Sequence, residues 1–160
     1  MNKIIKKTIG FSLLELVIVI AIVGIMVLIA SPMFRESQNK VILEGAQASL
    51  IGSLEEARSR ALTGVGENVD EIHGIYIDYS TNEIYSCKGT VADWPSNGCL
   101  PVMLEENISL IKENAADPDI KIIEFERLSG KTSQETVTLR NDLTGEEIET
   151  EIDENGFIEI

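Results

Sequence analysis

The chain has 160 residues, with 27 Asp and Glu against 13 Lys and Arg, and a formal net charge of −14 at pH 7. Such an acidic surface repels phosphate backbones, because nucleic-acid binding depends on neutralisation by Lys and Arg. Direct nucleic-acid binding is therefore not expected. The one histidine, His73, and the lack of a G-x-S-x-G, H-E-x-x-H or phosphate-loop motif give no indication of a catalytic site, a metal site or a cofactor.

The N-terminal part joins a short basic stretch to a long apolar run. Lys3, Lys6 and Lys7 precede residues 11–34, in which Glu15 is the only charged side chain. Residues 16–34 approach the ~20 apolar residues that a helix needs to cross a bilayer, and the lysines predict that the N-terminal side stays in the cytoplasm. A carboxylate in hydrocarbon costs roughly 2.5–3.5 kcal/mol. It therefore usually marks a contact with a specific partner.

The motif GFSLLE at residues 10–15, after a Lys-rich leader and before an apolar helix, resembles a type IV prepilin signal. Ser12 stands where Thr is commoner in that family, and Pro32 where many members carry a helix-kinking proline. An ordinary secretory signal ends a shorter apolar core at small residues, which residues 29–31 fit poorly. The resemblance implies cleavage between Gly10 and Phe11 by a prepilin peptidase and N-methylation of Phe11.

The same resemblance implies a role for Glu15 and a set of partners. Glu15 is expected to pair with the terminal amine of an adjacent subunit and so set the register of assembly. The partners are other pilin or pseudopilin subunits, an inner-membrane assembly platform and an assembly ATPase. The chain is expected in the cytoplasmic membrane with its C-terminal domain outside, and then in an extracytoplasmic filament.

Several alternatives remain open at this point. The filament is a type IV pilus, a type II secretion pseudopilus or a competence pseudopilus, and the subunit is major or minor. A membrane-tethered monomeric binding module is a different class of function, and it would not need Glu15 for assembly. An anchored enzyme is a further alternative that no motif supports.

A second helical pattern follows the apolar run. Small or aliphatic residues recur at spacings of three or four, as in an amphipathic helix with one buried face: Leu43, Ala46, Leu50, Leu54, Ala57 and Ala61. Gly64 and Gly66 end the pattern. Both helical segments are expected to join as one long helix, bent near Pro32. Packing on the protein's own sheet is favoured over a coiled-coil seam, because the heptad support is weak.

The period then changes to that of strands. Residues 72–78 and 83–87 around the turn 79–82 predict a hairpin. Further strands are expected at 108–112, 120–126, 136–140, 147–152 and 157–160. The alternation predicts an antiparallel meander with one apolar and one acidic face, packed on a helix. The expected class is α+β.

This order of elements divides the chain into four parts: a leader at 1–10, a transmembrane assembly helix at 11–34, an amphipathic helix at 35–65 and a β-rich head at 66–160. The stretch LEEARSRA at residues 54–61 is similar to that of minor pseudopilins related to the H-type subunit of type II secretion and of FimT-like minor pilins. That similarity favours a minor subunit.

Cys87 and Cys99 are the only cysteines. In an exported domain they are expected to form a disulfide, worth about 3 kcal/mol for a loop of this size; two free thiols are the alternative. Trp94 in the loop is either a contact residue or partly buried core.

Acidic turns at 117–119 and 153–156 offer oxygen ligands of the kind that Ca²⁺ favours. Neither turn has the spacing of an EF-hand, and solvated turn carboxylates are the preferred interpretation.

Overall fold

A computed structural model describes residues 12–64 and 71–159; for residues 29–34 it describes the helical backbone but not the side chains. The chain divides into two units, Met1–Gln38 and Asn39–Ile160. One helix, α1 (Leu13–Thr63), contributes to both, so the two predicted helical segments are one helix. Gly10, Phe11 and Gly66 lie outside the described residues, as does the Pro32 side chain. The cleavage site, the methylation site and the kink therefore stay predictions.

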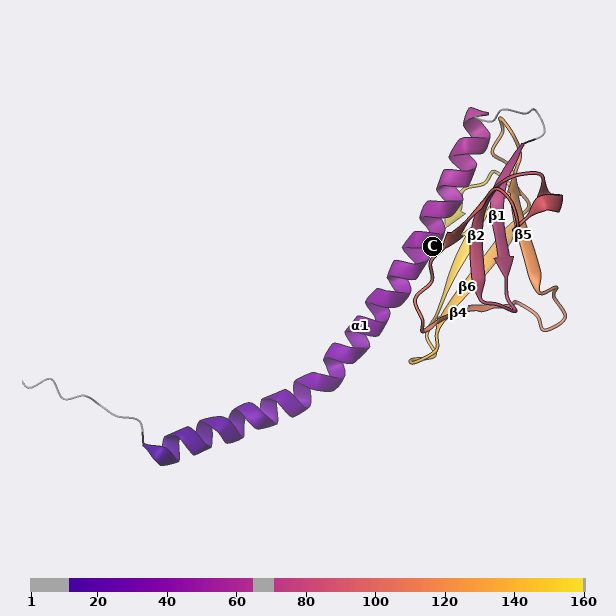
Figure 1. The fold of residues 1–160 in the computed structure, drawn as a ribbon. Coiled ribbons are helices and arrows are strands. Elements are labelled where there is room, and N and C mark those ends of the chain that lie inside the picture. The colour runs from indigo at the N-terminus through magenta and orange to yellow at the C-terminus, as the bar shows by residue number, and fades with distance from the viewer. Residues whose placement is uncertain (1–11, 65–70, 160) are drawn as a thin grey trace, which may run out of the picture. The chain divides into compact units, whose positions relative to one another are not determined.

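The second unit contains two antiparallel sheets of four strands each (Figure 1). The first has the order β3-β2-β1-β5 and the second the order β4-β6-β7-β8. The strands are β1 (Ile72–Asp78), β2 (Glu83–Gly89), β3 (Cys99–Val102), β4 (Ile108–Ile111), β5 (Ile120–Phe125), β6 (Glu135–Asn141), β7 (Glu147–Ile152) and β8 (Ile158–Glu159), with a short 3-10 helix, η1 (Val91–Asp93), before β3.

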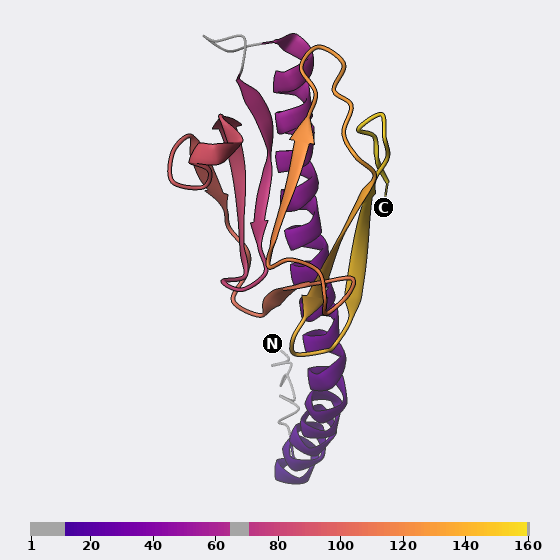
Figure 2. The ribbon, with the colours of Figure 1, turned by 90° about the vertical axis from the view of Figure 1, so that its right-hand side faces the viewer.

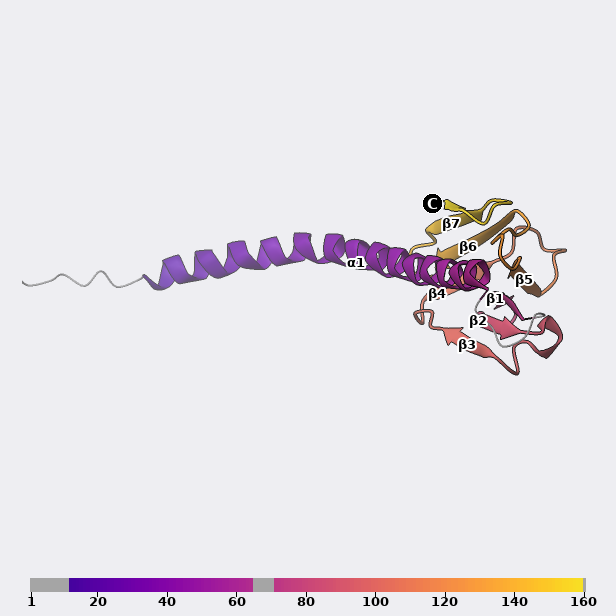
Figure 3. The same cartoon turned by 90° about the horizontal axis from the view of Figure 1, so that it is seen from above.

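The part of α1 in this unit lies against both sheets, which flank its C-terminal end (Figures 2 and 3). Its six predicted core positions are all buried, with exposed fractions of 4% or less. They meet the inward side chains of both sheets, including Ile75, Ile123, Val137 and Ile152. The amphipathic stripe is therefore confirmed, and with it the α+β class.

Side-chain amides connect the helix to the second sheet. Gln47 Nε2 donates to the Glu149 carbonyl oxygen at 3.1 Å and to Thr150 Oγ1 at 3.3 Å. Asn141 Nδ2 donates to the Asn39 carbonyl oxygen at 3.0 Å. Because Gln47, Thr150 and Asn141 are buried, these bonds fix the helix on the sheet where an unpaired polar group would be costly.

The predicted strands are confirmed within one or two residues, but the expected meander is wrong in one respect. The strands form two sheets rather than one continuous series, because β4 pairs with β6 and with neither β3 nor β5. The strand β3 was not predicted from the sequence. Its four residues include Pro101, which lacks an N–H donor and weakens the strand pattern.

Candidate assembly site

Glu15 is the acidic residue of the first turn of α1. The residue is exposed, and the helix begins with Leu16 N–H donating to the Ser12 carbonyl oxygen at 3.2 Å. A carboxylate in a first helical turn is favoured by the N-terminal end of the helix dipole. The structure thus places Glu15 at a helix start, where no other described part of the chain covers its side chain. Its expected partner, an amine on Phe11 of another subunit, lies outside the described residues.

The helix that follows Glu15 is apolar on all its sides. Every described residue from 12 to 28 is exposed, and the large apolar side chains keep between 47% (Val19) and 80% (Leu13) of their surface. A helix that is hydrophobic all round needs burial in other protein or in lipid, since each such side chain gains about 1.5–3 kcal/mol on burial. Within residues 12–64 and 71–159, no helix combines the length and hydrophobicity of a membrane span.

The C-terminal end of α1 is anchored by Arg58. Its guanidinium carbon lies 4.3 Å from the centre of the Phe157 ring, and its Nη2 donates to the Asn155 carbonyl oxygen at 3.1 Å. The glycine that precedes Phe157 allows this approach, because a Cβ on Gly156 would lie 3.0 Å from Arg58 Nε and 2.3 Å from the Gly130 carbonyl oxygen. Arg58 therefore joins the end of the helix to the last turn of the chain.

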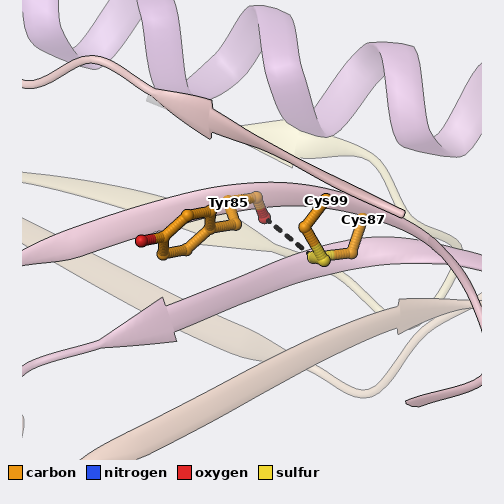
Figure 4. The surroundings of a disulfide bond; sticks show 3 residues. All are labelled: Tyr85, Cys87 and Cys99. Carbon is orange, nitrogen blue, oxygen red and sulfur yellow. Dashed lines mark hydrogen bonds between the residues drawn. A yellow bond between two sulfur atoms is a disulfide. The ribbon is translucent and has the colours of Figure 1, made fainter. Parts of the chain in front are cut away.

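Cys87 and Cys99 form a disulfide between facing residues of β2 and β3. The Cys87 Sγ lies 3.8 Å from the Tyr85 carbonyl oxygen (Figure 4). Trp94 in the enclosed loop is only 7% exposed and packs with Tyr76 and Cys87. It covers Gly74, where a Cβ would lie 3.1 Å from Trp94 Cη2. Trp94 is thus part of a small second core and not an exposed contact residue.

Lys121 of β5 connects the two sheets. Its Nζ lies 2.9 Å from Glu135 Oε2 and 3.2 Å from Glu113 Oε1, and it donates to the Thr136 carbonyl oxygen at 2.8 Å. Burial of Lys121 opposes its charged form, but the hydrogen bond to Glu135 and the Glu135 charge outweigh that effect and raise the pKa of the ammonium. The ammonium therefore remains charged between the sheets.

The acidic turns proposed for Ca²⁺ use their carboxylates within the chain. Asp117 Oδ2 accepts from Asn114 N–H at 2.8 Å, and Asp119 pairs with Lys112. Asp153 Oδ1 accepts from Phe157 N–H at 2.7 Å, and this bond, with those from Asn155, holds the pKa of Asp153 below its ordinary value. In the described part of the chain, no three His, Cys, Asp or Glu residues are grouped as metal ligands would be. His73 is buried in β1 opposite Phe125.

Comparison with known proteins bears on the N-terminal part alone. Residues 5–31 match a protein family described as the prokaryotic N-terminal methylation motif. No curated protein matches the chain. No solved structure matches it either. The matched stretch contains Gly10, Phe11 and Glu15, and it supports a type IV pilin-like protein processed by a prepilin peptidase.

Proposed function

We propose that this chain is a structural subunit of a type IV filament system. The precursor waits in the cytoplasmic membrane, a prepilin peptidase removes residues 1–10, and Phe11 is N-methylated. The mature subunit then enters a helical fibre through the helix that starts at Phe11. The observation that carries the proposal is the match of residues 5–31 to the methylation motif, together with Glu15 in the first turn of an apolar helix.

The chemistry of Glu15 supports this assignment. Cleavage after Gly10 creates a new amino group at the head of the helix, one turn before Glu15. An isolated carboxylate among apolar side chains is costly, whereas an ion pair in a low-dielectric environment is strong if both partners are well placed. Pairing of Glu15 with the amine of the next subunit satisfies both charges only when the subunits are in register. The pair thus fixes the register between neighbouring subunits.

The exposed helix supports the same function. In the isolated chain its apolar side chains, from Leu13 to Leu28, have no cover among the described residues. A membrane covers them before assembly and neighbouring helices cover them afterwards. Repetition of one head-to-tail contact that does not close gives an open filament. The work of moving the helix from lipid to fibre comes from an assembly ATPase acting through a platform protein.

The similarity of residues 54–61 to H-type pseudopilins and FimT-like pilins favours a minor subunit of a secretion pseudopilus or a pilus. A competence pseudopilus is the alternative within the family. A monomeric tethered binding module is the alternative outside it. A gene for a secretion ATPase or one for a retraction ATPase beside the gene for this chain would separate a secretion pseudopilus from a pilus.

Intact-mass measurement and N-terminal sequencing of the native protein test the proposal directly. The expected chain starts at N-methylated Phe11 and contains residues 11–160. A chain that starts at Met1, or near Ser31 as after ordinary signal cleavage, would contradict the proposal.

A further inference from the structure

The main-chain groups of β5 on the side away from β1 can be assigned from the strand register. Tyr79 N–H donates to the Asp119 carbonyl oxygen at 2.8 Å, which continues the register in which Asp78 faces Ile120. Hydrogen-bonded and non-bonded pairs alternate along an antiparallel ladder. Residues 121, 123 and 125 therefore bond to β1, and the main-chain groups of Ile122 and Glu124 point outwards.

The end of β5 agrees with this assignment. Glu126 has the same parity as Ile122 and Glu124, and its outward groups are paired: its N–H donates to the Lys131 carbonyl oxygen at 2.7 Å, and its carbonyl oxygen accepts from Gly130 N–H at 2.8 Å. Apart from this turn, β5 and β6 belong to different sheets and do not pair. Among the described residues, no strand pairs with β5 at Ile122 and Glu124.

The three other sheet edges in the described part of the chain offer less to an added strand. On β3, the bond from Lys88 N–H to the Gly98 carbonyl oxygen fixes which residues bond to β2, and by the same alternation the main-chain groups of Pro101 point away from β2. Proline has no N–H to offer an added strand. On β4 the Asn82 side chain occupies the edge, with Nδ2 donating to the Ile108 carbonyl oxygen and Oδ1 accepting from Leu110 N–H, both at 2.7 Å. The last edge, β8, is two residues long.

The open edge lies in a cleft. A space of about 790 Å³ is lined by Ile122 and Glu124 on one side and by residues 131–133 on the other. Figure 2 shows β5 running up to the connecting loop, from which the chain returns at a distance from β5 towards β6. Thr132 Oγ1 is buried there and has no hydrogen-bond partner in the described structure. At the start of β5, the bond from Lys121 Nζ to the Thr136 carbonyl oxygen joins β5 to β6 and limits the opening.

We propose that this cleft accepts an extended, basic segment of a partner protein, which adds to β5 as a further strand. Main-chain bonds to Ile122 and Glu124 provide the affinity, as in other cases of strand addition. The exposed Glu124 carboxylate and the chain's net charge of −14 select lysine or arginine in the segment. The lining holds three carboxylates and two bases, and one of these bases, Arg127, donates to the Gly64 carbonyl oxygen.

A second copy of this domain is the less suitable occupant. Its β3, β4 and β8 edges offer less to an added strand, as described above, and its own β5 lies inside a cleft. An unpaired extended segment, such as a linker or tail of another protein, can enter the cleft where a folded sheet edge cannot. This inference does not depend on filament assembly.

Amide hydrogen exchange of the full chain in detergent tests the free edge first. The Ile122 and Glu124 amides are expected to exchange quickly, while those of Lys121, Ile123 and Phe125 are protected by β1. Slow exchange at Ile122 and Glu124 in the free chain would mean that the edge is already paired, and would overturn the proposal. So would protection that rises with protein concentration, because it would identify a second copy as the occupant.

The probe is a synthetic peptide of alternating lysine and valine, capped at both ends. It is expected to slow exchange at Ile122 and Glu124 and to shift their amide resonances. A peptide with glutamate in place of lysine, and one with N-methylated valines that cannot complete the ladder, should do neither. Equal binding of all three peptides, or none by the lysine peptide, would refute the proposal.

Two variants locate the binding. Ile122→Pro removes an outward N–H and should abolish protection by the lysine peptide, whereas Ile120→Pro, at the first residue of the strand and outside the cleft lining, should leave it intact. Glu124→Lys keeps the strand and serves if Ile122→Pro does not fold. It should reduce binding of the lysine peptide and increase that of the glutamate peptide. Unchanged preference in Glu124→Lys would contradict the role given to its charge.

Discussion

At the scale of single residues, the important contacts of this protein are of two kinds. Glu15 has significance because of its immediate neighbours in sequence, so the motif at residues 10–15 was enough to select it. Lys121 and Arg58 have significance because of partners that the fold brings to them. Arg58 lies 97 residues from the carbonyl it binds, and no local pattern could have indicated that contact.

Replacement of Glu15 by alanine should separate assembly from the earlier steps. Membrane insertion and cleavage after Gly10 should be unchanged, because neither needs the carboxylate in our proposal. Incorporation into filaments should fall at least about tenfold, since removal of one member of a buried ion pair typically costs about 3–5 kcal/mol. The measurement is the fraction of subunit in sheared filaments against that in membranes.

Glu36→Ala is the matched control for this experiment. Glu36 is an exposed acid on the same helix, outside the apolar run, and its loss should leave incorporation near the level of the unchanged protein. Normal incorporation of Glu15→Ala would remove the role assigned to Glu15.

Lys121→Met should destabilise the second unit by about 1–3 kcal/mol, because Glu135 and Glu113 lose their partly buried cationic partner. The raised pKa of Lys121 gives this effect a pH dependence. A raised folded-state pKa contributes stability that is fully present below the ordinary value of 10.5 and is lost as pH rises through the folded-state pKa. The stability difference between the two proteins should therefore shrink above that value.

Thermal unfolding followed by circular dichroism, at neutral and at strongly alkaline pH, measures this difference. Lys40→Met is the control, because its partner Glu44 forms a pair in which both side chains are more than half exposed. Such a pair contributes about 0–1 kcal/mol. A Lys121 effect that is small at neutral pH, or that grows at alkaline pH, would contradict the ion-pair account.

At the scale of elements, the helix and most strands could be predicted because each has a period that burial imposes. The six apolar positions of α1 in the second unit are spaced for one face, and the alternation of β7 matches its pairing with β6. The four-residue β3 could not be predicted, because its proline weakens the local pattern and its place depends on the disulfide and on β2. The division into two sheets could not be predicted either, since it depends on which distant strands pair.

The helix face gives a test at this scale. Leu50 is fully buried, and Leu50→Ala should destabilise the second unit by about 3–5 kcal/mol through lost contacts and a residual cavity. Val41→Ala, on the same helix at 64% exposure, should change stability by no more than about 0.5 kcal/mol. The same thermal unfolding measures both, and similar effects of the two would show that the stripe is not the core.

At the scale of the whole molecule, the hydrophobic periods predicted the class of the fold, and the motif at residues 10–15 predicted the likeness to type IV pilins. They could not predict the β5 cleft, which arises where two sheets separate. The acidic excess of the sequence, 27 Asp and Glu against 13 Lys and Arg, acts at this scale too, because in the filament that we propose neighbouring copies repel one another through their acidic surfaces.

Side-by-side association of purified filaments should therefore increase with salt. Raising the ionic strength from about 0.01 M to about 0.15 M shortens the Debye length from about 30 Å to about 8 Å, so repulsion between acidic surfaces weakens. Light scattering at constant filament concentration measures the effect. A decrease in scattering with salt would instead indicate that pairs of opposite charge hold neighbouring filaments together.

The interrupted or short edges of β3, β4 and β8 have a consequence for crowded conditions. In the function that we propose, subunits share a membrane before assembly and collide often, and an exposed strand edge is a starting point for irreversible aggregation. Pro101, Asn82 and the short β8 leave little for such collisions to extend, and β5 is recessed in its cleft. The domain can thus be present at high local concentration without aggregating through its strand edges.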